Sequence, residues 1–200
     1  LVSLDKLKVQ YTKKVGVVIL THYHKSNQDI KAIASWCKKN KILLLEDCAI
    51  ALGSFIDKKH VGSFGDMGFY SFGLFKFAPA YIGGAMYIKD KEIRIKIEKR
   101  LDKSKTIQER DIRPYFFNGL KLDILTSKMI FKYFTFPIYR WGYFKDIKFI
   151  KNQAKNDPLP HKKKFFPDLY KKQISNFQIK QIVNKVKNIF IDKEKRLKNA

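Results

Sequence analysis

Asp47 is the first residue whose type and place suggest chemistry. It follows the apolar run Ile42 to Leu45 and Glu46, so it stands at the carboxyl end of a segment with the composition of a buried strand. In open α/β sheets, ligands bind beyond the carboxyl ends of the strands, where a carboxylate can point into a crevice. An aspartate at this place can also cap a helix or close a turn, and spacing alone favours that structural role.

Lys76 is the second candidate, because its neighbours from Phe72 to Phe77 are mostly apolar and aromatic. Burial in such surroundings disfavours the charged ammonium and leaves a neutral amine that can form an imine with a carbonyl. The alternative is an ordinary surface lysine, since the chain has 42 Lys and Arg residues in total. Composition does not decide between the two interpretations.

Ser71 and the pair Gly83–Gly84 lie close to Lys76 in the sequence and suit an anionic ligand. Ser71 ends a predicted strand, and its hydroxyl could bond a phosphate or simply close a turn. The two glycines could let the backbone approach a ligand closely or could form a plain β-turn. The sequence has no phosphate-loop, dinucleotide-binding, zinc-protease or nucleophile-elbow motif.

The histidines and cysteines predict no metal site. His22 and His24 flank the end of the first predicted strand, but a metal pair needs a third ligand and none is evident nearby. Cys37 and Cys48 form no metal-type cluster. They indicate a reduced, cytoplasmic setting.

A strand–helix–strand unit must position these residues. Val15 to Thr21 is a continuous apolar run typical of a buried parallel strand, and Ile42 to Leu45 is a second one. Together with the helix between them they predict the α/β class, with a mostly parallel sheet and helices on both faces. The helix is predicted over Asn27 to Asn40, with a cap at Ser26 or Asn27 and apolar residues at helical spacing: Ile30, Ile33, Ala34 and Cys37.

The chain changes character after about residue 110. Before it, we expect a hairpin around residues 57–59, a turn at 62–66, strands at 67–72 and 84–88, and a charged helix at 90–103. Beyond it, residues 115–150 are dense in aromatics, 156–167 form a Pro- and Lys-rich linker, and 169–198 are helical. The last helix has a predicted apolar stripe of Ile174, Phe177, Ile182, Val186 and Ile189.

The net charge of +24 could attract nucleic acid, anionic lipid or phosphorylated substrates. The cations are spread along the chain, so we interpret them as composition bias and expect no nucleic-acid partner. The stretch from Met129 to Ile150 mixes aromatics with cations and could lie at a membrane surface. Because Pro137 should interrupt any long helix there, we favour an aromatic core hairpin or a dimer contact.

Taken in order, these segments resemble the DegT/DnrJ/EryC1/StrS family of sugar aminotransferases, which depend on pyridoxal 5'-phosphate (PLP). The resemblance implies the large domain of the aspartate-aminotransferase fold (fold type I). It covers roughly residues 15 to 90. The matching features are His22, Asp29, Glu46–Asp47, Ala49, Leu52–Gly53, the turn 62–66, Ser71–Phe72, Lys76 and Gly83–Gly84.

The resemblance implies Lys76 as the Schiff-base lysine, Asp47 as the partner of the cofactor's ring nitrogen and Ser71 as a phosphate ligand. The implied reaction moves an amino group, typically from glutamate, to a keto group of a nucleotide-linked sugar. Surface polysaccharide or glycoconjugate biosynthesis would be the setting, and a cytoplasmic homodimer the form. The family's dehydratases carry His in place of the lysine, so Lys76 favours transamination.

By the same resemblance, residues 1–110 are part of the PLP-binding large domain. Residues 111–168 are an aromatic and basic insertion with a linker, and 169–200 a helix leading into a small domain. We expect a fragment or a truncated relic, since the family's phosphate loop would precede residue 1. A non-enzymatic relative that binds anionic surfaces is the alternative. Ile50, Ile82 and the truncation support it, and Lys171 and Gln173 replace family residues that reach a partner subunit's cofactor site.

Overall fold

The computed structural model describes residues 3–23, 29–148, 150, 167–189, 191 and 198. The predicted caps Ser26 and Asn27, His24, and the linker up to residue 166 lie outside these residues. The chain divides into two compact units, one of residues 1–108 and 171–200 and the other of residues 109–170. Within the described ranges, no helix is both long enough and apolar enough to cross a membrane.

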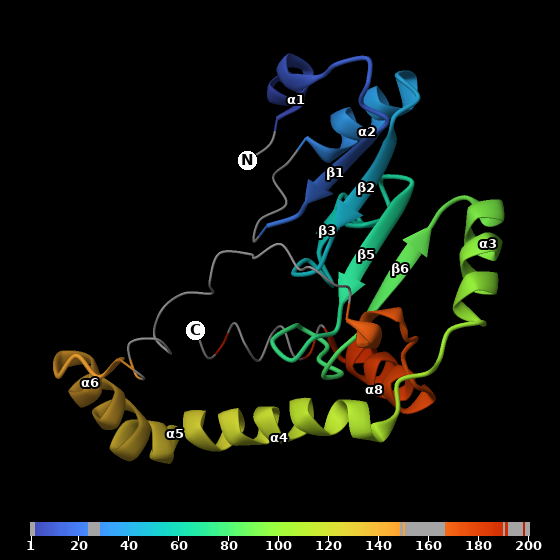
Figure 1. Cartoon of the computed structure of the whole chain (residues 1–200). Helices are drawn as coiled ribbons and strands as arrows, with labels where there is room; N and C mark the ends of the chain where they lie inside the picture. The colour runs from blue at the N-terminus through green and yellow to red at the C-terminus, as the bar shows by residue number, and fades with distance from the viewer. Residues whose placement is uncertain are drawn as a thin grey trace. The chain divides into compact units, whose positions relative to one another are not determined.

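A four-stranded sheet forms the centre of the first unit, in the order β1-β2-β5-β6 (Figure 1). Strands β1, β2 and β5 are parallel to one another, and β6 runs antiparallel to β5. The predicted α/β class with a mostly parallel sheet is therefore confirmed. The strands are β1 (Val17–Thr21), β2 (Leu43–Asp47), β5 (Met67–Ser71) and β6 (Gly84–Ile88).

Helix α2 (Ile30–Lys39) covers one face of this sheet. Its side chains Ile30, Ile33 and Cys37 are buried against Leu20 of β1 and Leu44 of β2, as the helical spacing predicted. Helix α1 (Leu4–Gln10) packs against the same cluster. Just after it, the ring of Tyr11 meets the ring of Trp36 edge-on at 5.0 Å.

The opposite face of β1 and β2 stays open in the described chain. Successive strand residues point to opposite faces, so Val17 and Ile19 point away from α2. Ile19 is 64% exposed, and Leu20 is the residue of β1 that is buried. The prediction that Val15 to Thr21 is buried throughout is therefore wrong for every second residue.

The remaining elements of the first unit are a short two-stranded hairpin and two helices. The predicted hairpin is confirmed, with Asp57 and Lys58 at its tip in left-handed backbone conformations. Asp90 caps the predicted charged helix through the backbone N–H of Ile93. The elements are β3 (Phe55–Ile56), β4 (Lys59–His60), α3 (Lys91–Leu101) and α8 (Asn176–Lys187).

The stripe expected on α8 is only partly confirmed. Ile182 and Ile189 are buried, but Phe177 and Val186 are exposed. Gln178, next to Phe177, is the buried residue instead, because it is part of a capping box with Ser175 that starts the helix. The buried side of α8 therefore includes the polar residue Gln178, which a search for apolar residues at helical spacing does not identify.

The described residues of the second unit are almost entirely helical. Helical residues run without a break from Lys128 to Phe144, so the prediction that Pro137 interrupts a long helix is wrong. Pro137 lies in the first turn of α6, directly after a π-helical turn, where the missing N–H of proline is tolerated. The elements are α4 (Glu109–Thr126), α5 (Lys128–Ile130), the π-helix η1 (Phe131–Thr135) and α6 (Phe136–Phe144), and the short 3₁₀-helix η2 (Asp168–Lys171) follows later.

Candidate functional site

The carboxyl ends of the parallel strands bring Asp47 and Ser71 to one edge of the sheet and one face. Thr21 of β1 is paired with Asp47 of β2, and Asp47 is paired with Phe69 of β5. Ser71 lies two residues beyond Phe69, so its side chain is on the same face as that of Asp47. This is the face opposite α2, which β1 and β2 leave open.

The carboxylate of Asp47 is oriented by its own turn. Its Oδ1 accepts a hydrogen bond from the backbone N–H of Ala49 at 3.0 Å, and Thr21 Oγ1 lies 3.5 Å from Oδ2. Asp47 therefore does have the turn-closing role that was the alternative to a functional one, but this role involves only its Oδ1 atom. The half-buried side chain keeps a defined direction at the strand end.

Lys76 lies in the turn that follows β5, next to Ser71. The backbone N–H of Lys76 donates to the carbonyl of Gly73 at 3.1 Å, and Gly73 donates its N–H to Ser71 Oγ at 3.4 Å. A Cβ built on Gly73 would stand 3.7 Å from Ser71 Oγ and 3.9 Å from Lys76 Cγ, so the two side chains border the same spot. The apolar enclosure expected for Lys76 is only partial, because Phe75 is 82% exposed and Lys76 itself is half-buried.

The glycine pair after this turn is required by the packing of the chain itself. Gly83 has φ +108°, and a Cβ there would collide with Ile174. A Cβ on Gly84 would come within 2.6 Å of the carbonyl oxygen of Tyr70. Both positions therefore need glycine without any ligand, which favours the turn interpretation over close ligand approach.

Glu46 is a buried anchor behind the site, on the face opposite to Asp47. Its Oε2 accepts from the backbone N–H of Gly62 at 2.8 Å and from His22 Nε2 at 2.9 Å, and its Oε1 accepts from Gly65 at 2.7 Å. Burial acts to raise the pKa of Glu46, but the hydrogen bonds from His22, Gly65 and Gly62 outweigh it and lower the pKa. An ionised carboxylate thus ties the turn after β4 to β2. Sequence reasoning missed it, although a Glu on the apolar face of a strand was a visible signal.

His22, Glu46 and Cys48 also offer possible metal-ligand atoms within 4.8 Å of one another among the described residues. Both oxygens of Glu46 already accept hydrogen bonds from the protein. Burial, with Glu46 and Asp47 nearby, raises the pKa of the Cys48 thiol to about 12, so the thiol stays protonated. The cluster therefore has the character of a structural anchor.

Glu46→Gln is expected to lower the free energy of unfolding by about 3 kcal/mol near pH 7, because it leaves a buried network without its charge. Since the folded-state pKa of Glu46 is lowered, its contribution is fully present above the unfolded-state pKa and disappears as the pH falls through the folded value. Urea unfolding at pH 7 and at a series of pH values below 4.5 should therefore show the difference between the two proteins shrinking as the pH falls. The exposed Glu98→Gln is the control and should change stability by less than about 0.5 kcal/mol. An equal effect of both substitutions at pH 7 would contradict the anchor role of Glu46.

Gln178 of α8 holds the segment that follows Lys76. Its side-chain amide donates to the carbonyls of Ala80 and Ile82, both at 3.0 Å, while Lys185 donates to the carbonyl of Pro79 at 2.7 Å. Ile182 packs into a cluster with Phe72, Ala78 and Ala80. Residues about 100 positions apart in the sequence therefore fix the loop that carries the lysine.

The positions that depart from the family pattern have roles within this chain. The carbonyl of Ile82 accepts from Gln178, and Gln173 donates its side-chain amide to the carbonyl of Ser104 at 3.3 Å. The backbone of Gln173 also pairs with Lys105 and Ile107. Ile50 is half-buried in the turn after Asp47, and Lys171 is exposed in η2.

A family model described as the DegT/DnrJ/EryC1/StrS aminotransferase family matches residues 1–114. That range contains the open face of the sheet, the carboxyl edge with Asp47 and Ser71, and the turn with Lys76. It ends shortly after the start of the second, helical unit.

Similarity to curated relatives and solved structures also covers only part of the chain. A dTDP-4-dehydro-2,3,6-trideoxy-D-glucose 4-aminotransferase from Saccharopolyspora spinosa is 33% identical over 91 residues, 46% of this chain and 24% of the relative. A GDP-perosamine synthase from Vibrio cholerae is 35% identical over 71 residues, 36% of this chain and 19% of the relative. The crystal structure of the aminotransferase TlmJ from Streptoalloteichus hindustanus superposes with a TM-score of 0.47 at 29% identity, covering 48% of this chain and 26% of that one. The chain thus spans a quarter or less of the length of these curated relatives.

Proposed function

Because the chain belongs to the DegT/DnrJ/EryC1/StrS aminotransferase family, we propose that the protein uses PLP to move an amino group onto a keto group of a nucleotide-linked sugar. One observation carries the proposal. Asp47 and Ser71 share one open face at the carboxyl edge of the sheet, and Lys76 borders Ser71 across Gly73. A ligand at this edge would meet a carboxylate, a hydroxyl and an amine from three different segments.

The residues at this edge fit the donors and acceptors that PLP requires. When bound, PLP supplies an electron sink for the bond that is broken at the amino-bearing carbon. The amine of Lys76 would bind the cofactor covalently and carry the proton. The carboxylate of Asp47 would hold a proton on the ring nitrogen, and the hydroxyl of Ser71 would donate to the phosphate.

The substrates and setting are part of the same proposal. The names of the similar proteins include dTDP- and GDP-linked sugars or their products, which supports a nucleotide-linked keto sugar as acceptor. Glutamate as donor, a homodimer, a cytoplasmic location and a place in glycoconjugate biosynthesis are proposed from family membership. Both described cysteines are free and buried, which agrees with a reducing compartment.

An absorbance spectrum of the purified protein with added PLP tests the cofactor site. We expect a visible band that borohydride reduction abolishes, and peptide mass mapping should place the reduced adduct on Lys76. A band that maps to other lysines in equal amounts would overturn the assignment, because the chain has many exposed amines.

A catalytically degenerate relative is the second candidate, and Ile50 and Ile82 favour it. Neither side chain can hydrogen-bond to a cofactor, and the carbonyl of Ile82 accepts from Gln178. For this candidate we expect a cooperatively folded protein that shows no reducible band at any PLP concentration. Thermal unfolding measured beside the spectrum distinguishes that outcome from an unfolded sample.

A further inference from the structure

The second unit exposes an unusual number of aromatic side chains on one continuous helix. We call the stretch from Lys128 to Phe144 the aromatic helix; it comprises α5, η1 and α6. The core hairpin expected for these aromatics is wrong, since Phe144 is 73% and Trp141 59% exposed, while the alternative of a dimer contact stays a prediction. The other exposed aromatics of this helix are Phe131, Tyr133, Phe134, Phe136, Tyr139 and Tyr143.

Cations are interleaved with these rings. Lys128, Lys132, Arg140 and Lys145 are all exposed along the helix or directly after it. The ammonium of Lys132 lies 5.0 Å from the ring centre of Tyr133, and the guanidinium of Arg140 lies 6.0 Å from that of Phe144. Each pair combines an apolar body with a charged tip, as side chains do at a boundary between water and hydrocarbon.

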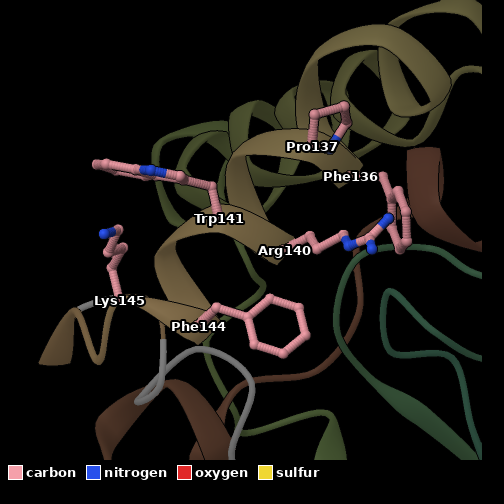
Figure 2. A pocket seen from close by; sticks show the side chains of 6 residues that line it. All are labelled: Phe136, Pro137, Arg140, Trp141, Phe144 and Lys145. Carbon is pink, nitrogen blue, oxygen red and sulfur yellow. The ribbon is translucent and has the colours of Figure 1, made fainter.

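One side of α6 is hollowed beside the pair formed by Arg140 and Phe144. A hollow of about 310 Å³ is lined by four apolar side chains and two cations: Phe136, Pro137, Trp141, Phe144, Arg140 and Lys145. Figure 2 shows Arg140 extended toward the ring of Phe136, while Lys145 lies on the side of Trp141. The chemistry that matches an apolar hollow with cations beside it is an anionic amphiphile, in which a charged head is joined to a hydrocarbon tail.

We propose that the aromatic helix lies in the surface of a membrane that contains anionic phospholipid, with the lipid phosphates near Arg140 and Lys145. A helix from Lys128 to Phe144 is about 25 Å long and can lie flat along such a surface. A protein partner fits these residues less well, because lysine is depleted at protein–protein interfaces whereas aromatics and cations together mark the membrane interface. This inference goes beyond the proposed function and does not depend on it.

Vesicle flotation of the 200-residue chain tests the proposal. We expect binding to vesicles of phosphatidylcholine with phosphatidylglycerol, little binding to phosphatidylcholine alone, and release at high salt. The double variant Arg140→Gln with Lys145→Gln should weaken binding about thirtyfold, as two lost cations near an anionic surface predict. The control variant Lys96→Gln with Lys99→Gln removes the same charge from exposed positions on α3 and should weaken it less than threefold.

Tryptophan fluorescence gives an independent readout, because the two tryptophans have different surroundings. Trp141 is exposed on the aromatic helix, whereas Trp36 packs against Tyr11. A blue shift on adding anionic vesicles should persist in Trp36→Phe and vanish in Trp141→Phe. Equal loss of binding in both charge variants would show only general attraction by net charge and overturn the proposal. Absence of vesicle binding, together with self-association that Trp141→Ala and Phe144→Ala abolish, would assign the helix to a protein contact instead.

Discussion

Lys76→Ala is expected to lower aminotransferase activity about 10⁴-fold and to abolish the borohydride-reducible absorbance. The substitution removes one amine to which we assign two tasks, covalent attachment of the cofactor and proton transfer, and each task alone is worth orders of magnitude in rate. The site is otherwise preserved, since Ser71 and Asp47 lie on strands that do not depend on this side chain. Steady-state rates with a keto sugar and an amino donor, measured beside the visible spectrum, check both effects.

Two matched variants separate the chemistry of Lys76 from its charge. Lys76→Arg keeps the positive charge but cannot form the covalent bond, so it should be as inactive as Lys76→Ala. Lys89→Ala removes an exposed lysine just after β6 and should keep full activity. This position lies at the amino ends of the parallel strands, away from the carboxyl edge that carries the candidate site. Activity in Lys76→Arg within tenfold of the unchanged protein would contradict the covalent role.

Asp47→Asn is expected to lower kcat about hundredfold to thousandfold while leaving the fold intact. The amide has the same shape and can still accept the hydrogen bond from the backbone of Ala49. It lacks the negative charge that would keep a proton on the cofactor's ring nitrogen, and losing one such electrostatic partner has an effect of this size. Rates at saturating substrate, with circular dichroism to confirm folding, measure the loss.

Asp90→Asn provides the control for Asp47. Asp90 caps α3, and asparagine caps a helix about as well as aspartate does, so stability and activity should both be retained. If Asp47→Asn retained full activity with a normal spectrum, the role of Asp47 would be limited to closing the turn through its hydrogen bond with Ala49.

The strand–helix–strand unit at the start of the chain was predictable because the pattern of apolar residues within each short segment determines its secondary structure. Apolar residues at helical spacing predicted the buried side of α2, and the continuous apolar runs before and after it predicted β1 and β2. Periodicity could not show that one face of β1 stays open, because a continuous apolar run has the same appearance whether one face or both are covered. The open face with Ile19 needed the structure.

The second unit was predicted less well, and for a physical reason. A proline in an aromatic stretch suggested a break, but the π-helical turn before Pro137 removes the conflict with the proline ring. Such a turn depends on the packing of neighbouring turns and has no local sequence signal. The expected break at Pro137 is also what favoured a core hairpin or a dimer contact for the aromatics over a helix at a membrane surface.

The sequence by itself determined the residues that can do chemistry and the strand ends where they stand. Lys76, Asp47 and Ser71 each follow or end a segment whose local pattern was clear. Only the tertiary structure decided which faces they share and what holds them. The register of β1, β2 and β5 places Asp47 and Ser71 together, Glu46 holds the turn behind them, and Gln178 fixes the loop after Lys76. These contacts join residues far apart in the chain, and local patterns carry no information about such pairings.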